Sequence, residues 1–292
     1  MGPEYTDSMQ TARPARAPKP LRFQIAGIPF AVRASSSQHR QWLRTAYKAF
    51  RTKRKPWVHL AIRTRSRSCF YVRNRERIVQ DGGHWQLESQ IFRIRELIPR
   101  KEYEAEIAAG PGIGDLMRAW FSGVLLSRGG ILLHAAGVIR AGRALVFCGP
   151  TGSGKTTLAR LAGSQPLLSD ESIAITRRSG AHGSAKIYYA HGTPFFGELA
   201  AATVNRCAPI GEIFLLDAKR SPRTRGGCRL SSVRASQSMA QLVAQSFLRR
   251  PAANSLNILL PLLDELIQRV RVCRLEFDPT AEIWDFIDDT CR

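Results

Sequence analysis

The sequence predicts an α/β protein in which a small α+β domain precedes a larger α/β domain. Three observations lead to this fold class. Short stretches with alternating apolar and polar residues recur between residues 21 and 110, as in half-buried strands. Gly110-Pro111-Gly112 then breaks the pattern and marks a linker. Beyond it, residues 144–162 hold an apolar run, a Gly-rich loop and a helix-forming segment in that order.

The expected organisation is a disordered basic tail over residues 1–20, an α+β domain over 21–110 and an α/β domain over 111–292. The tail holds Pro, Ala and isolated cations, which cannot build a core. The remaining length is sufficient for two cores, because 44% of the 292 residues are hydrophobic.

In the α+β domain, strands are expected at residues 21–25, 58–63, 70–72 and 90–94, with a turn at Asp81-Gly82-Gly83. Between the first two, Ser36 is expected to cap a helix. That helix carries its apolar residues close to one face, and they are Trp42, Leu43, Tyr47 and Phe50.

The α/β domain is expected to begin with a helix over residues 113–126, which Gly129-Gly130 stops. Short apolar runs predict its strands, at 131–133, 144–148, 166–169, 173–175, 187–189, 210–216 and 272–277. Helical spacing predicts its remaining helices, at 157–162, 242–248 and 256–270.

A complete phosphate-binding loop follows the strand at 144–148. It reads Gly149-Pro150-Thr151-Gly152-Ser153-Gly154-Lys155-Thr156, with Thr157 at the start of a helix. Glycines let successive backbone N–H groups turn toward a phosphate, and the helix dipole favours the same anion. Lys155 is expected on the β- and γ-phosphates and the Thr156 hydroxyl on Mg²⁺. The chain is therefore expected to bind ATP and Mg²⁺ through residues 149–157.

Chemistry beside this loop is expected from His134, Asp170 and Glu171. His134 ends a strand fifteen residues before Gly149, and Asp170 follows Lys155 by fifteen residues at the end of the next strand. A carboxylate there can deprotonate an acceptor hydroxyl while Lys155 and Mg²⁺ take the phosphoryl charge. Glu171 is a candidate metal ligand, although adjacent strand residues point to opposite faces unless the strand has ended.

A competing acid is Asp217, which follows the apolar residues 213–216 as a Walker B aspartate does. Any buried strand that ends in Asp gives this pattern, and a basic stretch rather than a second carboxylate comes next. We therefore expect a structural role for Asp217 and keep the Mg²⁺ role as an alternative.

Four segments together resemble the catalytic domain of HPr serine kinase/phosphorylase, over roughly residues 130 to 285. They are Leu133-His134-Ala135-Ala136-Gly137-Val138, Ala144-Leu145-Val146-Phe147, the phosphate loop, and Leu168-Ser169-Asp170-Glu171. They look closer still to the HPr kinase-like proteins encoded near bacterial peptide-modification genes, such as lasso-peptide clusters. The resemblance implies a P-loop kinase core related to phosphoenolpyruvate carboxykinase, with a mixed sheet.

The resemblance also implies roles for individual residues. Asp170 matches the general base of the family, His134 matches its upstream histidine, and Glu171 replaces a second Asp. Residues 189–198 are similar to a Gly-Thr-Pro…Gly-Glu stretch of the kinase-like branch, which makes Glu198 a candidate metal or substrate contact. The signature for phosphorolysis is not recognisable, so the resemblance implies kinase activity alone. Residues 21–110 do not match the family's own N-terminal domain.

The formal net charge is +21, from 44 Lys and Arg against 23 Asp and Glu, which favours polyanionic partners. Two basic regions stand out, one over residues 51–67 and one over 219–234, and either is suited to an acidic peptide. No RNA-recognition or helix-turn-helix signature accompanies them, so no motif points to nucleic acid. The expected partner is a peptide or small protein; a homo-oligomer stays open.

The compartment is expected to be the cytoplasm. The six cysteines are scattered without metal-ligand spacing, which is typical of reduced thiols, and no apolar run is long enough to span a membrane. The expected function is an ATP- and Mg²⁺-dependent kinase that acts on a hydroxyl of a peptide or small protein, with Ser as the expected acceptor. The alternatives are a nucleotide-binding regulatory protein or slow ATPase that uses Asp217, and a small-molecule kinase.

Overall fold

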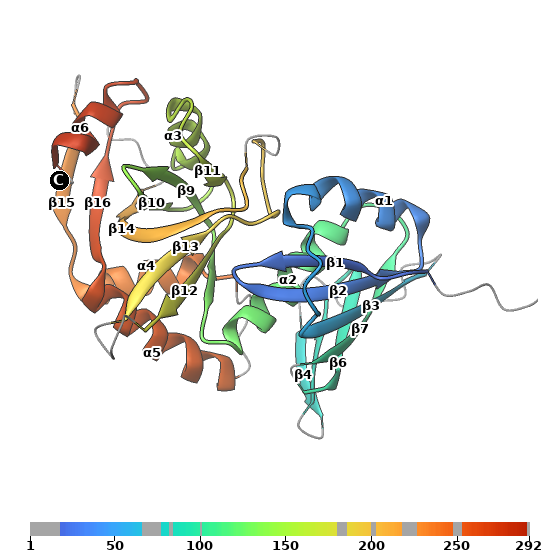
Figure 1. The fold of residues 1–292 in the computed structure, drawn as a ribbon. Helices are drawn as coiled ribbons and strands as arrows, with labels where there is room; N and C mark the ends of the chain where they lie inside the picture. The colour runs from blue at the N-terminus through green and yellow to red at the C-terminus, as the bar shows by residue number, and fades with distance from the viewer. Residues whose placement is uncertain are drawn as a thin grey trace, which may run out of the picture.

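The structure is a computed structural model, and it describes residues 18–65, 77–81, 84–99, 101–179, 186–199, 203–217, 227–247 and 253–290. Within these residues the strands form a seven-stranded and a nine-stranded sheet, both of mixed direction, which confirms the mixed α/β class. Figure 1 shows the two sheets side by side, with helices packed around them. In the described part of the chain no helix combines the length and apolar character that crossing a membrane requires.

The first sheet, here the N-terminal sheet, has the strand order β1-β2-β3-β7-β6-β5-β4. Its strands are β1 (Leu21–Ile25), β2 (Ile28–Ala34), β3 (Val58–Arg65), β4 (Arg77–Asp81), β5 (His84–Glu88), β6 (Phe92–Ile98) and β7 (Glu102–Ala108). The pairs β2–β3 and β3–β7 are parallel, and the others are antiparallel. Buried and exposed side chains alternate along β3 and β7, so one face of this sheet packs on a core.

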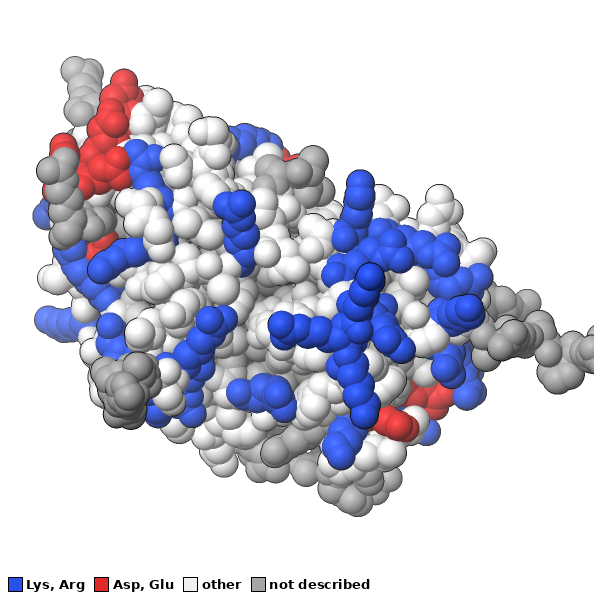
Figure 2. All heavy atoms as spheres, in the orientation of Figure 1, with Lys and Arg blue, Asp and Glu red and all other residues white. Residues whose placement is uncertain are grey.

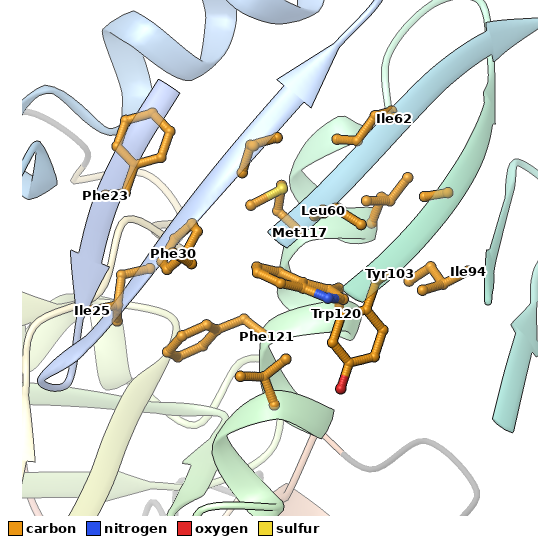
Figure 3. Packing of buried hydrophobic residues seen from close by; sticks show 14 of the residues in the cluster. Phe23, Ile25, Phe30, Leu60, Ile62, Ile94, Tyr103, Met117, Trp120 and Phe121 are labelled. Atoms are coloured by element: carbon orange, nitrogen blue, oxygen red, sulfur yellow. The ribbon is translucent and has the colours of Figure 1, made fainter. Parts of the chain in front are cut away.

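Helices α1 (Ser37–Ala46) and α2 (Ile113–Leu126) contribute to the core of the N-terminal sheet. Trp120 of α2 is fully buried and lies edge-on to Phe30 of β2 and to Tyr103 of β7. Figure 3 shows Met117, Trp120 and Phe121 pointing from α2 toward the strands. Although α2 follows the predicted boundary near residue 110, its apolar face therefore shares the core of the N-terminal sheet.

The second sheet, here the C-terminal sheet, has the order β11-β9-β10-β14-β13-β12-β8, with β16 beside β14 and β15 beside β16. Its strands are β8 (Ile131–Leu133), β9 (Ala135–Arg140), β10 (Arg143–Cys148), β11 (Leu167–Ser169), β12 (Ile173–Arg178), β13 (Ile187–His191), β14 (Cys207–Leu215), β15 (Arg229–Ser232) and β16 (Arg271–Glu276). At its centre, β10 and β16 both run parallel to β14.

Helices cover both faces of the C-terminal sheet (Figure 1). One core holds side chains of α4 (Ala235–Gln245) and α5 (Ala253–Arg269), such as Leu242 and Leu263. The other holds side chains of α3 (Lys155–Leu161) and α6 (Ile283–Thr290), such as Leu158 and Trp284. Because both faces are covered, strands such as β8 and β10 are buried almost along their whole length.

Several predicted elements occur close to their expected bounds, and two differ. The helix capped by Ser36 ends at Ala46, and Lys48–Phe50 forms a separate 3₁₀ turn, so Tyr47 and Phe50 lie beyond it. The helix expected at 242–248 is instead α4, which ends at Gln245 because Ser246 turns into an extended conformation and bridges to Leu133. The strand expected at 70–72 and the basic stretch 218–226 lie outside the described residues.

Candidate active site

The phosphate loop joins β10 to α3 at the centre of the C-terminal sheet. Gly152 and Gly154 have φ angles of +82° and +97°, which side chains rarely adopt. A Cβ on Gly149 would lie 2.6 Å from the carbonyl oxygen of Leu216, the residue after β14. The sequence pattern therefore produces a tightly turned loop that the neighbouring parallel strand supports.

Lys155 is the first residue of α3, and its side chain folds back over the loop. Its Nζ donates hydrogen bonds to the carbonyl oxygens of Gly149 at 2.7 Å and Pro150 at 3.0 Å. Burial lowers the pKa of Lys155, while the nearby carboxylate of Glu171 opposes this shift. The ammonium group is thus desolvated, which strengthens its attraction for an anion in the loop.

The polar groups of the loop fit a phosphate. The Ser153 hydroxyl is buried and has no hydrogen-bond partner among the described residues. Thr156, where the motif places a Mg²⁺ ligand, is half-buried in the first turn of α3. The described residues contain no group of three or more His, Cys, Asp or Glu that could hold a metal ion. Mg²⁺ that arrives with a nucleotide needs only one or two protein oxygens, because phosphates and waters supply the rest.

Asp170 follows β11, and its carboxylate is enclosed by backbone. Oδ1 accepts a hydrogen bond from the Gly197 N–H at 2.9 Å, and Oδ2 accepts from Glu198 and Leu199 at 2.8 and 3.1 Å. The residue is 1% exposed. Asp170 therefore fixes the position of residues 197–199, which the sequence could indicate only as a Gly-Glu stretch.

The Gly192-Thr193-Pro194 stretch lies at the start of the segment that leads to residues 197–199, and it is tightly packed. Gly192 has no room for a side chain, because a Cβ there would lie 2.0 Å from the carbonyl oxygen of Val204. The Thr193 hydroxyl is fully buried and donates to the carbonyl oxygen of Ser172 at 2.7 Å. Phe195 then packs edge-on against Tyr47 of the N-terminal core. This stretch thus connects the residues around Asp170 to the other sheet.

Glu171 differs from Asp170 in that its side chain is 28% exposed. The strand β11 ends at Ser169, so the alternation of faces no longer applies, and both carboxylates lie against Gly197. Oε1 of Glu171 lies 3.5 Å from Nδ1 of His134, and the hydrogen bond from His134 is the largest cause that lowers the pKa of Glu171. Burial opposes this shift, and the charges of Arg118 and Lys155 support it.

Arg118 is a site residue that sequence reasoning missed. It lies on α2, and its Nη1 donates to Oε1 of Glu171 at 3.3 Å, while the guanidinium lies 5.2 Å from the centre of the Phe247 ring. Its Nε is buried without a partner among the described residues. Only the helical spacing of α2 was visible in the sequence, so no signal connected this arginine to a carboxylate that lies far along the chain.

The structure brings together Lys155, Asp170, Glu171 and His134, whereas Glu198 and Asp217 have other charged partners. The Glu198 side chain is 67% exposed and pairs with Arg160, so its backbone N–H rather than its carboxylate reaches Asp170. Asp217 follows β14 beside the loop, where its Oδ2 lies 2.5 Å from Nη1 of Arg274.

A comparison of the sequence with models of known protein families and with curated proteins finds no match to either.

Proposed function

We propose that this chain is an ATP- and Mg²⁺-dependent kinase of the HPr kinase-like type, which transfers the γ-phosphoryl group to a Ser hydroxyl of a peptide or small protein. The observation that carries the proposal is the position of Glu171. A part-exposed carboxylate whose pKa is lowered lies beside the lysine of a phosphate loop. The charges of Glu171 and Lys155 act on each other, so a base and a phosphate-binding group belong to one site, as phosphoryl transfer to a hydroxyl requires.

The residues divide the reaction between them. The backbone of residues 149–154 and the ammonium of Lys155 hold the phosphates. Thr156 would provide an oxygen ligand for Mg²⁺, which when bound would neutralise charge on the β- and γ-phosphates. The acceptor hydroxyl gives its proton to a carboxylate, its oxygen bonds to the γ-phosphorus, and the bond from that phosphorus to the bridging oxygen of ADP breaks. Arg118 donates to Glu171 and helps to keep that carboxylate ionised.

Two carboxylates compete for the role of base. The resemblance implies Asp170, whereas the contacts favour Glu171, because the Asp170 carboxylate already accepts three backbone hydrogen bonds and is almost fully buried. We propose Glu171 as the group that meets the acceptor hydroxyl, held by His134, and Asp170 as the residue that positions residues 197–199.

The test compares Glu171→Gln with Asp170→Asn, using γ-labelled ATP and a Ser-containing peptide. E171Q should lower transfer by about a hundredfold or more, with nucleotide affinity and thermal stability close to those of the unmodified chain. D170N should lower thermal stability, since an amide NH₂ replaces one acceptor opposite backbone N–H groups. A D170N chain that is as stable as the original and cannot transfer phosphate would assign the base to Asp170 instead.

A slow ATPase or nucleotide-binding regulatory protein is the second candidate, because Asp217 follows the parallel strand next to the phosphate loop. In that case the label would appear in free phosphate, and Asp217→Asn would abolish the release of labelled phosphate from ATP. The contact with Arg274 favours the structural role, in which D217N leaves transfer unchanged. Label in a sugar or another small alcohol would identify a small-molecule kinase.

A further inference from the structure

The N-terminal sheet and the helix beside it carry an unusual distribution of charge. Residues 18–65 contain no Asp or Glu, and their Lys and Arg side chains are largely exposed. Figure 2 shows Lys and Arg gathered over α1, β1 and β2 on this side of the molecule. Such a concentration of one sign raises the free energy of the folded chain through repulsion, so it calls for an explanation.

The other half of the same sheet is neutralised. On β3, β6 and β7, Arg63 pairs with Glu104, Arg65 pairs with Glu106, and Arg93 lies 2.9 Å from Glu88 of β5. Among the described residues no such pair exists for a second group of exposed cations, which we name the cationic surface. It consists of Arg22, Arg44, Lys48, Arg51, Lys53, Arg54 and Lys55.

The cationic surface is continuous in the fold. Arg44 and Lys48 lie one helical turn apart, at the end of α1 and the start of the 3₁₀ turn. Arg51 bridges to Phe23 of β1, and the Thr52 N–H donates to the carbonyl oxygen of Arg22 at 3.2 Å. The cations of the loop 51–55 are therefore held beside β1.

This surface also adjoins the candidate active site. The side chain of Asn205 donates to the carbonyl oxygen of Ala49, between Lys48 and Arg51, at 3.1 Å. Tyr47, in the same turn, contacts Phe195 of the segment that surrounds Asp170. Ala49 and Tyr47 therefore tie the cationic surface to the segments that pack around the candidate active site.

We propose that the cationic surface binds an acidic stretch of the acceptor peptide and so presents its hydroxyl to the site; this inference rests on the proposed kinase function. An acidic peptide fits better than a membrane, because the large exposed hydrophobic side chains of the described residues all lie elsewhere, at Leu97, Ile98, Ile187, Ile258 and Leu260. It also fits better than single-stranded nucleic acid, which binds through stacking aromatic rings. The aromatic side chains here are buried or half-buried, and Arg128 covers Trp57 at 3.8 Å.

The experiment measures the binding of a fluorescein-labelled peptide of alternating Glu and Gly with one Ser, by anisotropy, to the full chain without nucleotide. The variant is Arg51→Glu with Lys53→Glu. The matched control is Arg95→Glu with Arg143→Glu, since both residues are exposed, lie outside the cationic surface and change the net charge equally. R51E/K53E should weaken binding by about tenfold or more, and raising the salt from about 0.1 M to 1 M should weaken it similarly. The control should stay within about twofold, and the corresponding Gln-Gly peptide should not bind.

Equal peptide affinity in R51E/K53E and in the control would overturn the proposal. So would an effect of R51E/K53E that appears only with an oligodeoxythymidine strand, or only with vesicles that contain phosphatidylserine, because the partner would then be nucleic acid or a membrane. The binding assay contains no nucleotide, so its result does not depend on kinase activity. A chain that binds the peptide but transfers no phosphate from added ATP would contradict the proposed function and leave the docking surface supported.

Discussion

Helices cover the N-terminal sheet on one face and the C-terminal sheet on both. The first sheet has alternating strands such as β7, while the second has nearly continuous buried strands such as β10. A sheet with a free face can display charges along its strands. A sheet without one presents polar groups only where its strands end, and that is where the phosphate loop, Asp170 and Glu171 lie. The difference leaves the ion pairs of β3 and β7 along an open face and confines the polar groups of the candidate active site to strand ends.

The largest expected effect concerns the single covered face of the N-terminal sheet. Trp120→Ala should lower the free energy of unfolding by about 3–5 kcal/mol, because it removes a fully buried indole between α2 and the strands. Urea denaturation measures this change. Trp120→Phe is the control: its cost should be smaller, since the indole N–H has no hydrogen-bond partner among the described residues. A cost below about 1 kcal/mol for W120A would show that α2 is not seated in this core.

The next largest expected effect concerns the C-terminal sheet, which helices cover on both faces. Burial, supported by the charge of Arg178, lowers the pKa of His191 on β13 to about 4. In the unfolded chain this histidine is protonated near its usual pKa of about 6.5, so above that pH its protonation does not affect the free energy of unfolding. As the pH falls from about 6.5 to 4, the unfolded chain gains a proton that the folded chain does not, and the free energy of unfolding falls by about 3 kcal/mol in total.

His191→Gln tests this pH dependence and keeps a partner for the Thr176 hydroxyl, which lies 2.8 Å from Nε2 of His191. Unfolding measured at a series of pH values should show a shallower loss of stability in H191Q than in the original chain. Parallel curves for the two proteins would contradict a neutral, buried His191.

A smaller effect should appear in the pH profile of phosphoryl transfer. Because His134 helps to lower the pKa of Glu171, His134→Ala should raise that pKa and move the acidic limb of the profile to higher pH. His59→Ala changes an exposed histidine of the N-terminal sheet and is the control. Identical acidic limbs in H134A and H59A would exclude Glu171 as the titrating group.

The smallest effect belongs to the free face. Arg63→Ala should change the free energy of unfolding by less than about 1 kcal/mol, because the Arg63 side chain is 71% exposed and its pair with Glu104 is hydrated. Thermal unfolding at low and high salt measures it. A larger loss would mean that this face is covered and that the two sheets do not differ as described.

Elements with a strong local pattern were predictable from the sequence. The loop of residues 149–156 is contiguous, and Ser36 caps its helix through its own side chain, which accepts from the His39 N–H. The strand β9 was missed, because its small residues at 135–137 carry little strand signal. The alternation of Tyr103, Ala105 and Ile107 could have revealed β7.

The candidate site was predictable only in part. The side chains near the phosphate loop could be predicted as active-site residues, because they lie at the ends of predicted strands. Arg118 could not, because its contact with Glu171 depends on how α2 packs between elements that are distant in sequence. The donors that hold Asp170 are backbone N–H groups of residues 197–199, and any sequence would supply those.

The position of α2 has a practical consequence for anyone who expresses part of this chain. A fragment that starts at residue 111 would keep the whole phosphate loop, yet it would bring α2 without the strands that shield Met117, Trp120 and Phe121. It would also lose Tyr47, against which Phe195 rests. Such a fragment should be prone to aggregation and should hold Asp170 loosely, so the nucleotide-binding half is not a portable module.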